Sequence, residues 1–317
     1  MHNHGHFANA LSISLHKNRQ DIEMFFLYRD TIEGVQEKIA NYRDKFLVLV
    51  GQDESRKYIF DPLDNWEYLD RWAQKPLVID VDYLAVDNKP YNRLHRVWFN
   101  QNTMANIETL LMHQPIMHIQ YTKGPWLSLM HGLHEHRVYT FEHYISKIKH
   151  NFVYSYGQQA VLGHEYNDHD FPFGPEIYNN NNLVSLLPYF NQCGGSVVSE
   201  TCKDFTLTEK TFQAIMAGHP FLLIGIKGSI QYLRHHGFDV FDDLLNHDYD
   251  RLDDLYDRID RLFADNTQIL STKIDRYSIA DRLEKNRWQL WRYRDRVTGD
   301  LFQKIVDIYS NEPERRA

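Results

Sequence analysis

One segment constrains the fold more than any other, the stretch from Ser196 to Ser229. Its apolar runs and breakers predict a strand at Ser196–Ser199, a helix that begins after Thr208, and a second strand at Phe221–Ile224. Thr208 is a natural N-cap, while Gly218 and Pro220 end the helix. Because the second strand has no polar alternation, it is typical of a parallel sheet covered on both faces. A strand–helix–strand unit is therefore expected here.

The same alternation of strands and helices runs along the rest of the chain. It predicts an α/β fold with two α/β units and a long terminal helix. The other expected strands lie at Phe46–Val50, Leu77–Val81, Arg96–Phe99, Ile116–Ile119 and Phe152–Ser155. The other expected helices lie at Thr31–Lys45, Thr103–Met112, after Gly228, at Tyr249–Phe263 and at Ile279–Tyr309, and a long polar loop is expected through Asn182.

Composition narrows the class of protein. The 317 residues are 43% hydrophobic, which is enough to build packed cores, and the apolar runs are too short to span a membrane. The N-terminus has no secretory pattern and the chain has only two cysteines, so a cytoplasmic protein is expected. The net charge is −8. A nucleic acid or another polyanion would therefore have to be bound by a local cluster of cations.

The strand–helix–strand unit also predicts a binding edge. In such a unit the end of the first strand, the start of the helix and the turn after the second strand lie on one edge of the sheet, where open α/β folds bind ligands. Helix N-termini at Thr208 and Gly228, with Lys210 and Lys227 beside them, favour an anion such as a diphosphate. Glu209 could accept hydrogen bonds from sugar hydroxyls. The alternative is that Glu209 is a favourable first-turn charge and Lys210 a solvated side chain.

The segment Leu207–Gly225 resembles the donor-binding segment of the alpha-1,3-fucosyltransferases, in which Thr-Glu-Lys precedes an apolar helix, Ala-Gly, a proline and a strand ending in glycine. It is still more similar to a group of uncharacterised glycosyltransferase-like proteins of tailed bacteriophages. The further matching positions are Ser199-Glu200-Thr201, Gly228-Ser229, Tyr232-Leu-Arg234, Gly237-Phe238 and Tyr249-Asp250. The resemblance covers roughly residues 195–260.

This resemblance implies that Glu209 and Lys210 contact the ribose and phosphates of a nucleotide sugar. It also implies a GT-B architecture of two Rossmann-like domains. We then expect an acceptor-side domain at 1–140, a donor-binding domain at 141–278 and a terminal helix at 279–317 that packs back on the first domain. The expected donor-binding residues are Ser199, Glu200, Thr201, Thr208, Glu209, Lys210, Gly225, Lys227, Gly228, Ser229 and Arg234.

The reaction that the resemblance implies is transfer of a sugar to an acceptor hydroxyl without a metal or a resident cofactor, the nucleotide sugar being a co-substrate. Lys210, Lys227 or Arg234 would stabilise the diphosphate as it leaves. The candidate bases for the acceptor hydroxyl are Asp80, Asp82 and His95, which lie near expected strand ends. A hydroxymethylated base in phage DNA is the first candidate acceptor, which would place the protein in the host cytoplasm. A cell-surface or other glycan is the second, and a non-catalytic module that binds nucleotide sugars is the competing class.

Three other patterns have ordinary explanations. Asp80 and Asp82 could share a metal ion, but two carboxylates on an edge strand explain the pair equally well. The histidines at 131, 134 and 136 are interpreted as a polar helix end. Basic and aromatic residues alternate on the terminal helix, a mixture that can bind nucleic acid. We favour instead a helix that its tryptophans pack across the two domains, with arginine stems lying over apolar surface. That helix carries Lys285, Arg287, Trp288, Trp291, Arg292, Tyr293, Arg294 and Arg296.

Overall fold

The computed structural model describes residues 118–130, 132–157, 159–161, 183–201 and 207–310. Nearer the N-terminus it describes four strands and the helical residues Gly34, Glu37, Ala40, Asn41, Ile107, Leu110 and Leu111. The chain forms two compact units, one made of residues 1–108 and 294–317 and the other of residues 109–293.

The first unit contains a parallel four-stranded sheet in the order β1-β2-β3-β4. The strands expected at Phe46–Val50 and Leu77–Val81 are confirmed, and the one expected at Arg96–Phe99 begins two residues earlier. All the described residues of the helices expected at Thr31–Lys45 and Thr103–Met112 are helical. The strands are β1 (Ile22–Leu27), β2 (Phe46–Gly51), β3 (Leu77–Val81) and β4 (Leu94–Trp98).

The second unit is built on a five-stranded sheet in the order β10-β9-β6-β7-β8. The four strands β10, β9, β6 and β7 are parallel, and β8 pairs antiparallel with β7. The strands are β6 (Trp126–Met130), β7 (Phe152–Tyr156), β8 (Gln159–Val161), β9 (Gly195–Ser199) and β10 (Phe221–Ile224). The fold is therefore α/β with mainly parallel sheets, as expected.

The strand–helix–strand unit of the sequence is confirmed as β9, α8 (Glu209–Met216) and β10. Thr208 is the N-cap of α8, and its hydroxyl accepts a hydrogen bond from the Lys210 amide at 3.4 Å. After α8, Gly218 has a φ of +66°, the left-handed conformation that favours glycine at a helix end. Local sequence signals therefore set both ends of this helix.

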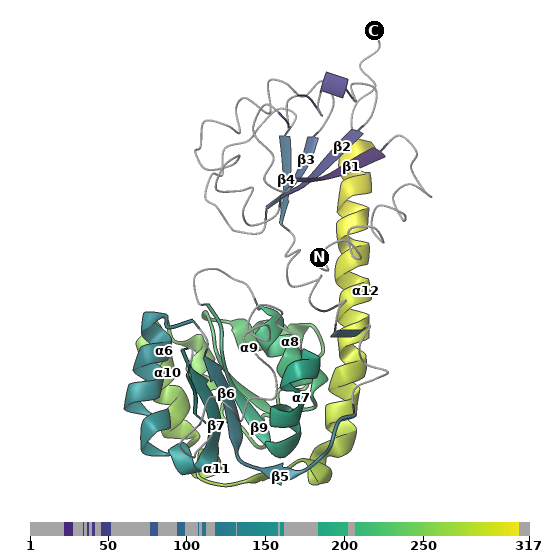
Figure 1. The fold of residues 1–317 in the computed structure, drawn as a ribbon. Coiled ribbons are helices and arrows are strands. Elements are labelled where there is room, and N and C mark those ends of the chain that lie inside the picture. Colours follow the sequence, from purple (N-terminus) through teal and green to yellow (C-terminus); the bar gives the residue numbers. More distant parts are fainter. Residues whose placement is uncertain are drawn as a thin grey trace. The chain divides into compact units, whose positions relative to one another are not determined.

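Helices cover both faces of the second sheet (Figure 1). On one face lie α6 (Glu135–His143) and α10 (Leu255–Asp265), which contact each other. On the other face lie α7 (Leu183–Gln192) and α8. Buried apolar side chains, among them Trp126, Phe152 and Leu222, join the sheet to α10 through Ile259 and Leu262. Burial of this apolar surface is the main term that stabilises the unit.

The chain continues from β10 into α9 (Ser229–His235), the helix expected after Gly228. The helix expected at Tyr249–Phe263 is in part a 3₁₀ turn, η5 (Asp248–Arg251), because the capping residue Asp254 starts α10 only at Leu255. Two short strands, β5 (Lys123–Gly124) and β11 (Ile274–Asp275), pair antiparallel. The remaining elements are η2 (Ile145–Lys147), η3 (Lys149–Asn151), α11 (Thr267–Leu270) and η6 (Arg276–Ile279).

The expected terminal helix is confirmed as α12 (Ala280–Ser310). The division between the two units falls within it, between Tyr293 and Arg294. Two expectations differ from the structure. His118 and Ile119, the described part of the strand expected at Ile116–Ile119, are irregular, and α6 spans the domain boundary expected after residue 140.

Among the described residues, no helix is both long enough and apolar enough to cross a lipid bilayer.

Candidate functional site

The order of the strands defines one edge of the second sheet as a candidate binding site. The chain leaves β6 for its neighbour β7 on one side and later enters β9 on the other side. The helices that follow β6 and β9, namely α6 and α8, therefore cover opposite faces. In open α/β sheets, ligands bind outside the carboxyl ends of the strands at such a reversal. The expected donor segment begins at this point, with Ser199 and Glu200.

Glu200 follows β9 directly and its side chain is buried. Its carboxylate accepts hydrogen bonds from the Thr208 amide at 3.0 Å, from the Thr211 hydroxyl at 2.5 Å and from the Thr208 hydroxyl. Burial raises the pKa of Glu200, and the charge of Lys210 opposes this effect. Glu200 is therefore a positioning residue that holds the start of α8 against the end of β9.

Glu209 and Lys210 lie in the first turn of α8, as expected. The Lys210 ammonium donates to Glu209 Oε1 at 2.7 Å and to the Thr208 hydroxyl at 3.2 Å. Both side chains are mostly buried, with exposed fractions of 28% for Lys210 and 12% for Glu209. An ammonium group has three N–H donors, so one remains without a partner among the described residues. Lys210 can therefore bind an anion without leaving Glu209.

The second expected helix start, at Gly228, has a different environment. Gly228 has a φ of +85°. The Asp250 carboxylate accepts hydrogen bonds from the amides of Ile230 and Gln231, both at 3.1 Å. A protein carboxylate thus already binds the amide groups that an external anion would need.

The side chains around the start of α9 also form hydrogen bonds or ion pairs within the protein. The Ser229 hydroxyl donates to the Ile226 carbonyl at 2.7 Å. Lys227 pairs with Asp253 at 2.6 Å, with both side chains largely exposed. Gly225 accepts a hydrogen bond from Arg258 at its carbonyl. Internal contacts therefore hold this turn, and Lys227 forms a solvent-exposed ion pair with Asp253.

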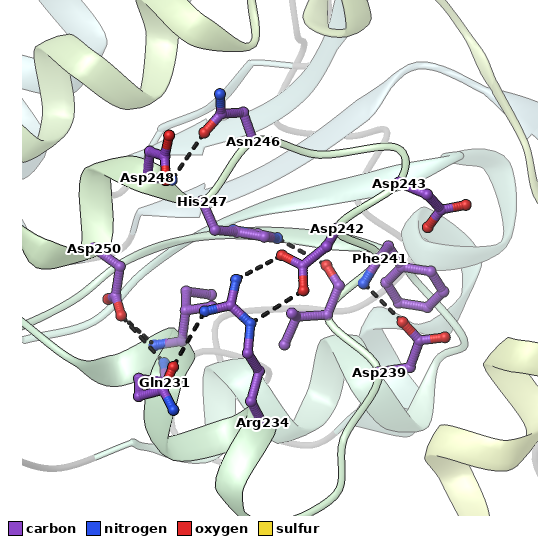
Figure 2. A network of polar contacts seen from close by, with 12 residues as sticks. Gln231, Arg234, Asp239, Phe241, Asp242, Asp243, Asn246, His247, Asp248 and Asp250 are labelled. Carbon is purple, nitrogen blue, oxygen red and sulfur yellow. Dashed lines mark hydrogen bonds and ion pairs between the residues drawn. The ribbon is translucent and has the colours of Figure 1, made fainter.

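Arg234 lies apart from the other expected donor residues. It occupies the last turn of α9, where its guanidinium binds both carboxylate oxygens of Asp242 at 3.1 and 2.5 Å (Figure 2). Arg234 lines a pocket of about 590 Å³, and none of the other expected donor residues lines it. Ile269, which also lines this pocket, accepts a hydrogen bond from the indole of Trp126, the first residue of β6. The pocket therefore lies toward the edge of the sheet where the strands begin.

The carboxylates of this pocket are mostly paired with arginines. Besides the Asp242–Arg234 pair, Asp243 binds Arg282 at 2.7 Å and Asp265 binds Arg261 at 2.7 Å. His247 is buried and bonded to the Val240 carbonyl at 2.7 Å, and burial lowers its pKa. These groups tie the loop after α9 to its neighbours, as Figure 2 shows for Arg234, Asp242 and His247.

The structure adds two residues that the sequence analysis did not select, His136 and Arg137 of α6. Both are buried at the carboxyl ends of β6 and β9. Arg137 donates to the carbonyls of Ser199 at 2.9 Å and Gly132 at 3.0 Å, and His136 bonds to the Glu200 carbonyl at 2.9 Å. Burial lowers the pKa of His136 to about 4, so the imidazole is neutral at pH 7.

The missed signal is the run Trp126-Leu-Ser-Leu-Met130, which forms the central strand β6. Once that strand is recognised, α6 becomes the helix after a central strand, and its first-turn residues belong to the candidate edge. His134 and His136 do lie at a helix end, the start of α6, as expected, but the His136 ring is buried against the backbone of Glu200.

The three candidate bases belong to the first unit. Asp80 lies near the end of β3, where its backbone pairs with Val50 and Val97. His95 is the second residue of β4 and pairs with Val78, two positions before Asp80 in the register. Asp82 lies outside the described residues. Of the remaining donor candidates, Thr201 is described and is partly buried.

Comparison of the chain with family models, with curated proteins and with solved structures found no match. Within the described ranges, no group of three or more His, Cys, Asp or Glu side chains is arranged to hold a metal ion.

Proposed function

We propose that this chain is a glycosyltransferase whose donor, a nucleotide-diphosphate sugar, binds where β6 and β9 end. The observation that carries the proposal is Lys210, which lies in the first turn of α8 with one N–H donor to spare. The Thr-Glu-Lys motif that resembles the fucosyltransferase donor segment is also the motif that begins α8. Parallel strands, a reversal of strand order and a partly buried cation are together typical of a phosphate-binding edge.

The roles proposed for individual residues follow from their contacts. Lys210 would donate to a phosphate oxygen and stabilise the charge that grows on the diphosphate as the sugar leaves. Glu209, paired with that ammonium, would accept a hydrogen bond from a ribose hydroxyl. Glu200 would hold the first turn of α8, and with it Lys210, in place through its hydrogen bonds to Thr208 and Thr211.

The same proposal includes a GT-B assignment with the first unit on the acceptor side. The base for the acceptor hydroxyl would then be Asp80, Asp82 or His95. The acceptor in this proposal is a hydroxymethylated base in DNA, with a glycan as the alternative. Arg234 has no part in it, because both oxygens of Asp242 hold its guanidinium and it lines a pocket that none of the other expected donor residues lines.

A binding experiment with a matched control tests the proposal. Melting temperatures of the purified chain are measured with a panel of nucleoside diphosphates and their sugar derivatives, because a ligand that binds only the native state raises stability by mass action. Calorimetry on the best ligand then compares the wild type with Lys210→Ala and with Lys273→Ala, which removes an exposed lysine outside the site.

We expect Lys210→Ala to weaken binding at least tenfold, because it removes the cation at the diphosphate, and Lys273→Ala to leave it unchanged. The proposal fails if no nucleotide raises the melting temperature, or if Lys210→Ala binds as tightly as the wild type. Binding without transfer or hydrolysis across an acceptor panel supports the competing class, a non-catalytic nucleotide-sugar-binding module.

A further inference from the structure

The part of α12 that belongs to the second unit has two different faces. On the buried face, Tyr293 stacks on Phe212 of α8 with ring centres 5.5 Å apart, and its hydroxyl lies 2.9 Å from that of Tyr232. Asn286, on the same face, exchanges hydrogen bonds with the backbone of Asp239. These contacts fix the rotation of α12 against α8 and α9. The opposite face carries Lys285, Trp288 and Arg292, which are all exposed.

Trp288 is the notable residue of this exposed face. Its side chain is 58% exposed, and no ring or cation among the described residues contacts it. Trp288 therefore does not pack in the interior of the second unit. An exposed aromatic ring on a helix is a surface on which a nucleobase can stack.

The two cations beside Trp288 differ from three arginines of the same helix. Arg282, Arg287 and Arg294 each pair with a carboxylate at 2.6 Å. Lys285 and Arg292 have no ion pair or hydrogen bond with any residue that the structure describes. The carboxylates nearest to this face are Asp281, one turn before Lys285, and Glu284 and Asp295, which pair with Arg287 and Arg294. Lys285 and Arg292 are therefore two cations beside Trp288 that no described carboxylate neutralises, although the net charge of the chain is −8.

The spacing of the three residues matches one ligand chemistry. At about 1.5 Å of rise and 100° per residue, Lys285 and Arg292 lie about 4.5 and 6 Å along the axis on either side of Trp288. All three side chains point within about 60° of one another. A base that stacks on the indole would thus have a cation on each side, where the phosphates before and after that base would lie.

We propose that the face formed by Lys285, Trp288 and Arg292, which we call the Trp288 face, binds single-stranded nucleic acid. An aromatic ring can stack only on a base whose face is accessible, and a duplex hides those faces. Unpaired cations on both sides of the ring then neutralise the adjoining phosphates. This inference goes beyond the proposed sugar transfer and does not depend on it.

The test uses the full chain and a fluorescein-labelled 15-residue oligodeoxythymidylate, with anisotropy titrations from 50 to 200 mM salt. Trp288→Ala should weaken binding about tenfold or more at every salt concentration, since stacking on one base is lost. The double variant Lys285→Gln/Arg292→Gln should lower the slope of log affinity against log salt by about 1.4, the value for two phosphate contacts on a single strand.

Tyr277→Ala is the matched control, because Tyr277 is 73% exposed but lies between Asp275 and Asp281 rather than between cations. It should bind like the wild type. The proposal is overturned if the oligonucleotide does not bind saturably, if Trp288→Ala binds as well as the wild type, or if Tyr277→Ala loses as much. Equal affinity for a blunt-ended duplex also overturns it. Binding of polyglutamate that depends on Trp288 overturns it as well, and indicates an acidic protein partner instead.

The same variants separate this inference from the sugar-transfer proposal. Trp288→Ala should retain the nucleotide-induced rise in melting temperature, and Lys210→Ala should retain oligonucleotide binding. Circular dichroism and melting of each variant confirm that it is folded, which is expected because Tyr277, Lys285, Trp288 and Arg292 are exposed and Lys210 is only partly buried.

Discussion

The Thr211 hydroxyl donates a hydrogen bond to the buried carboxylate of Glu200 at 2.5 Å, and this contact ties the first turn of α8 to the end of β9. The same carboxylate accepts from the Thr208 amide, so one side chain satisfies two donors of the helix start. Lys210 owes its position to this arrangement. Glu200, one of the expected donor-binding residues, therefore stabilises the start of α8 and acts on the proposed site by positioning Lys210.

The first prediction concerns the hydrogen bonds of Glu200. Glu200→Ala should lower the free energy of unfolding by about 2–4 kcal/mol, because it leaves the Thr208 amide and the Thr211 hydroxyl buried without an acceptor. Glu200→Gln keeps an acceptor oxygen and should cost about 1 kcal/mol. Urea denaturation measures both. Equal losses for the two variants would show that the volume of the side chain matters and its hydrogen bonds do not.

The second prediction is a pH dependence with a defined sign. Burial raises the pKa of Glu200 in the folded state above its unfolded value of about 4.3. The folded state therefore binds the proton more tightly, and the stability that Glu200 contributes is full below the unfolded pKa and is lost as pH rises through the folded pKa. The difference in unfolding free energy between the wild type and Glu200→Gln should thus shrink from pH 4 to pH 8. A difference that grows with pH would contradict the raised pKa.

The third prediction compares two glycines. A Cβ at Gly228 or at Gly299 would meet no atom within 4 Å, so backbone conformation alone separates them. Gly228 has a φ of +85°, and Gly228→Ala should destabilise the protein by about 1 kcal/mol or more. Gly299 lies inside α12, where alanine is the better helix former, and Gly299→Ala should stabilise by about 0.5–1 kcal/mol. Thermal melts test both, and shifts of the same sign would contradict the assigned backbone conformations.

The fourth prediction concerns Arg276, which is fully buried. Its guanidinium donates to the carbonyls of Ala217 at 3.1 Å and Phe190 at 3.1 Å, and it also binds the carbonyls of Gly218, Gln120 and Asn191. Burial lowers the pKa of Arg276 to about 10, which still leaves it charged at pH 7.

Arg276→Lys should therefore destabilise the protein by about 3 kcal/mol, because an ammonium cannot reproduce the planar set of donors and leaves several carbonyls unpaired. The control is Arg261→Lys, whose side chain is 56% exposed and pairs with Asp265, and which should change stability by less than about 0.5 kcal/mol. Chemical denaturation of both variants at pH 7 checks the difference. A small effect at Arg276 would mean that water reaches these carbonyls.

Local sequence signals determined much of the second unit. The limits of β10 and the cap at Thr208 follow from apolar runs and from the preferences of threonine, glycine and proline, all of which act over a few residues. The first-turn position of Lys210 follows from the same cap. Helical spacing likewise predicted α12, because a long amphipathic pattern has no competing local structure.

Tertiary structure decided which groups meet. Sequence spacing cannot show that Asp250, twenty residues after Ile230, binds the start of α9, or that Arg137 of α6 binds the end of β9. It also could not separate Trp288, which is exposed, from Tyr293, which is buried five residues later. The physical reason is that local preference fixes backbone conformation, whereas burial, pairing and pKa depend on side chains that only the packing of distant elements brings together.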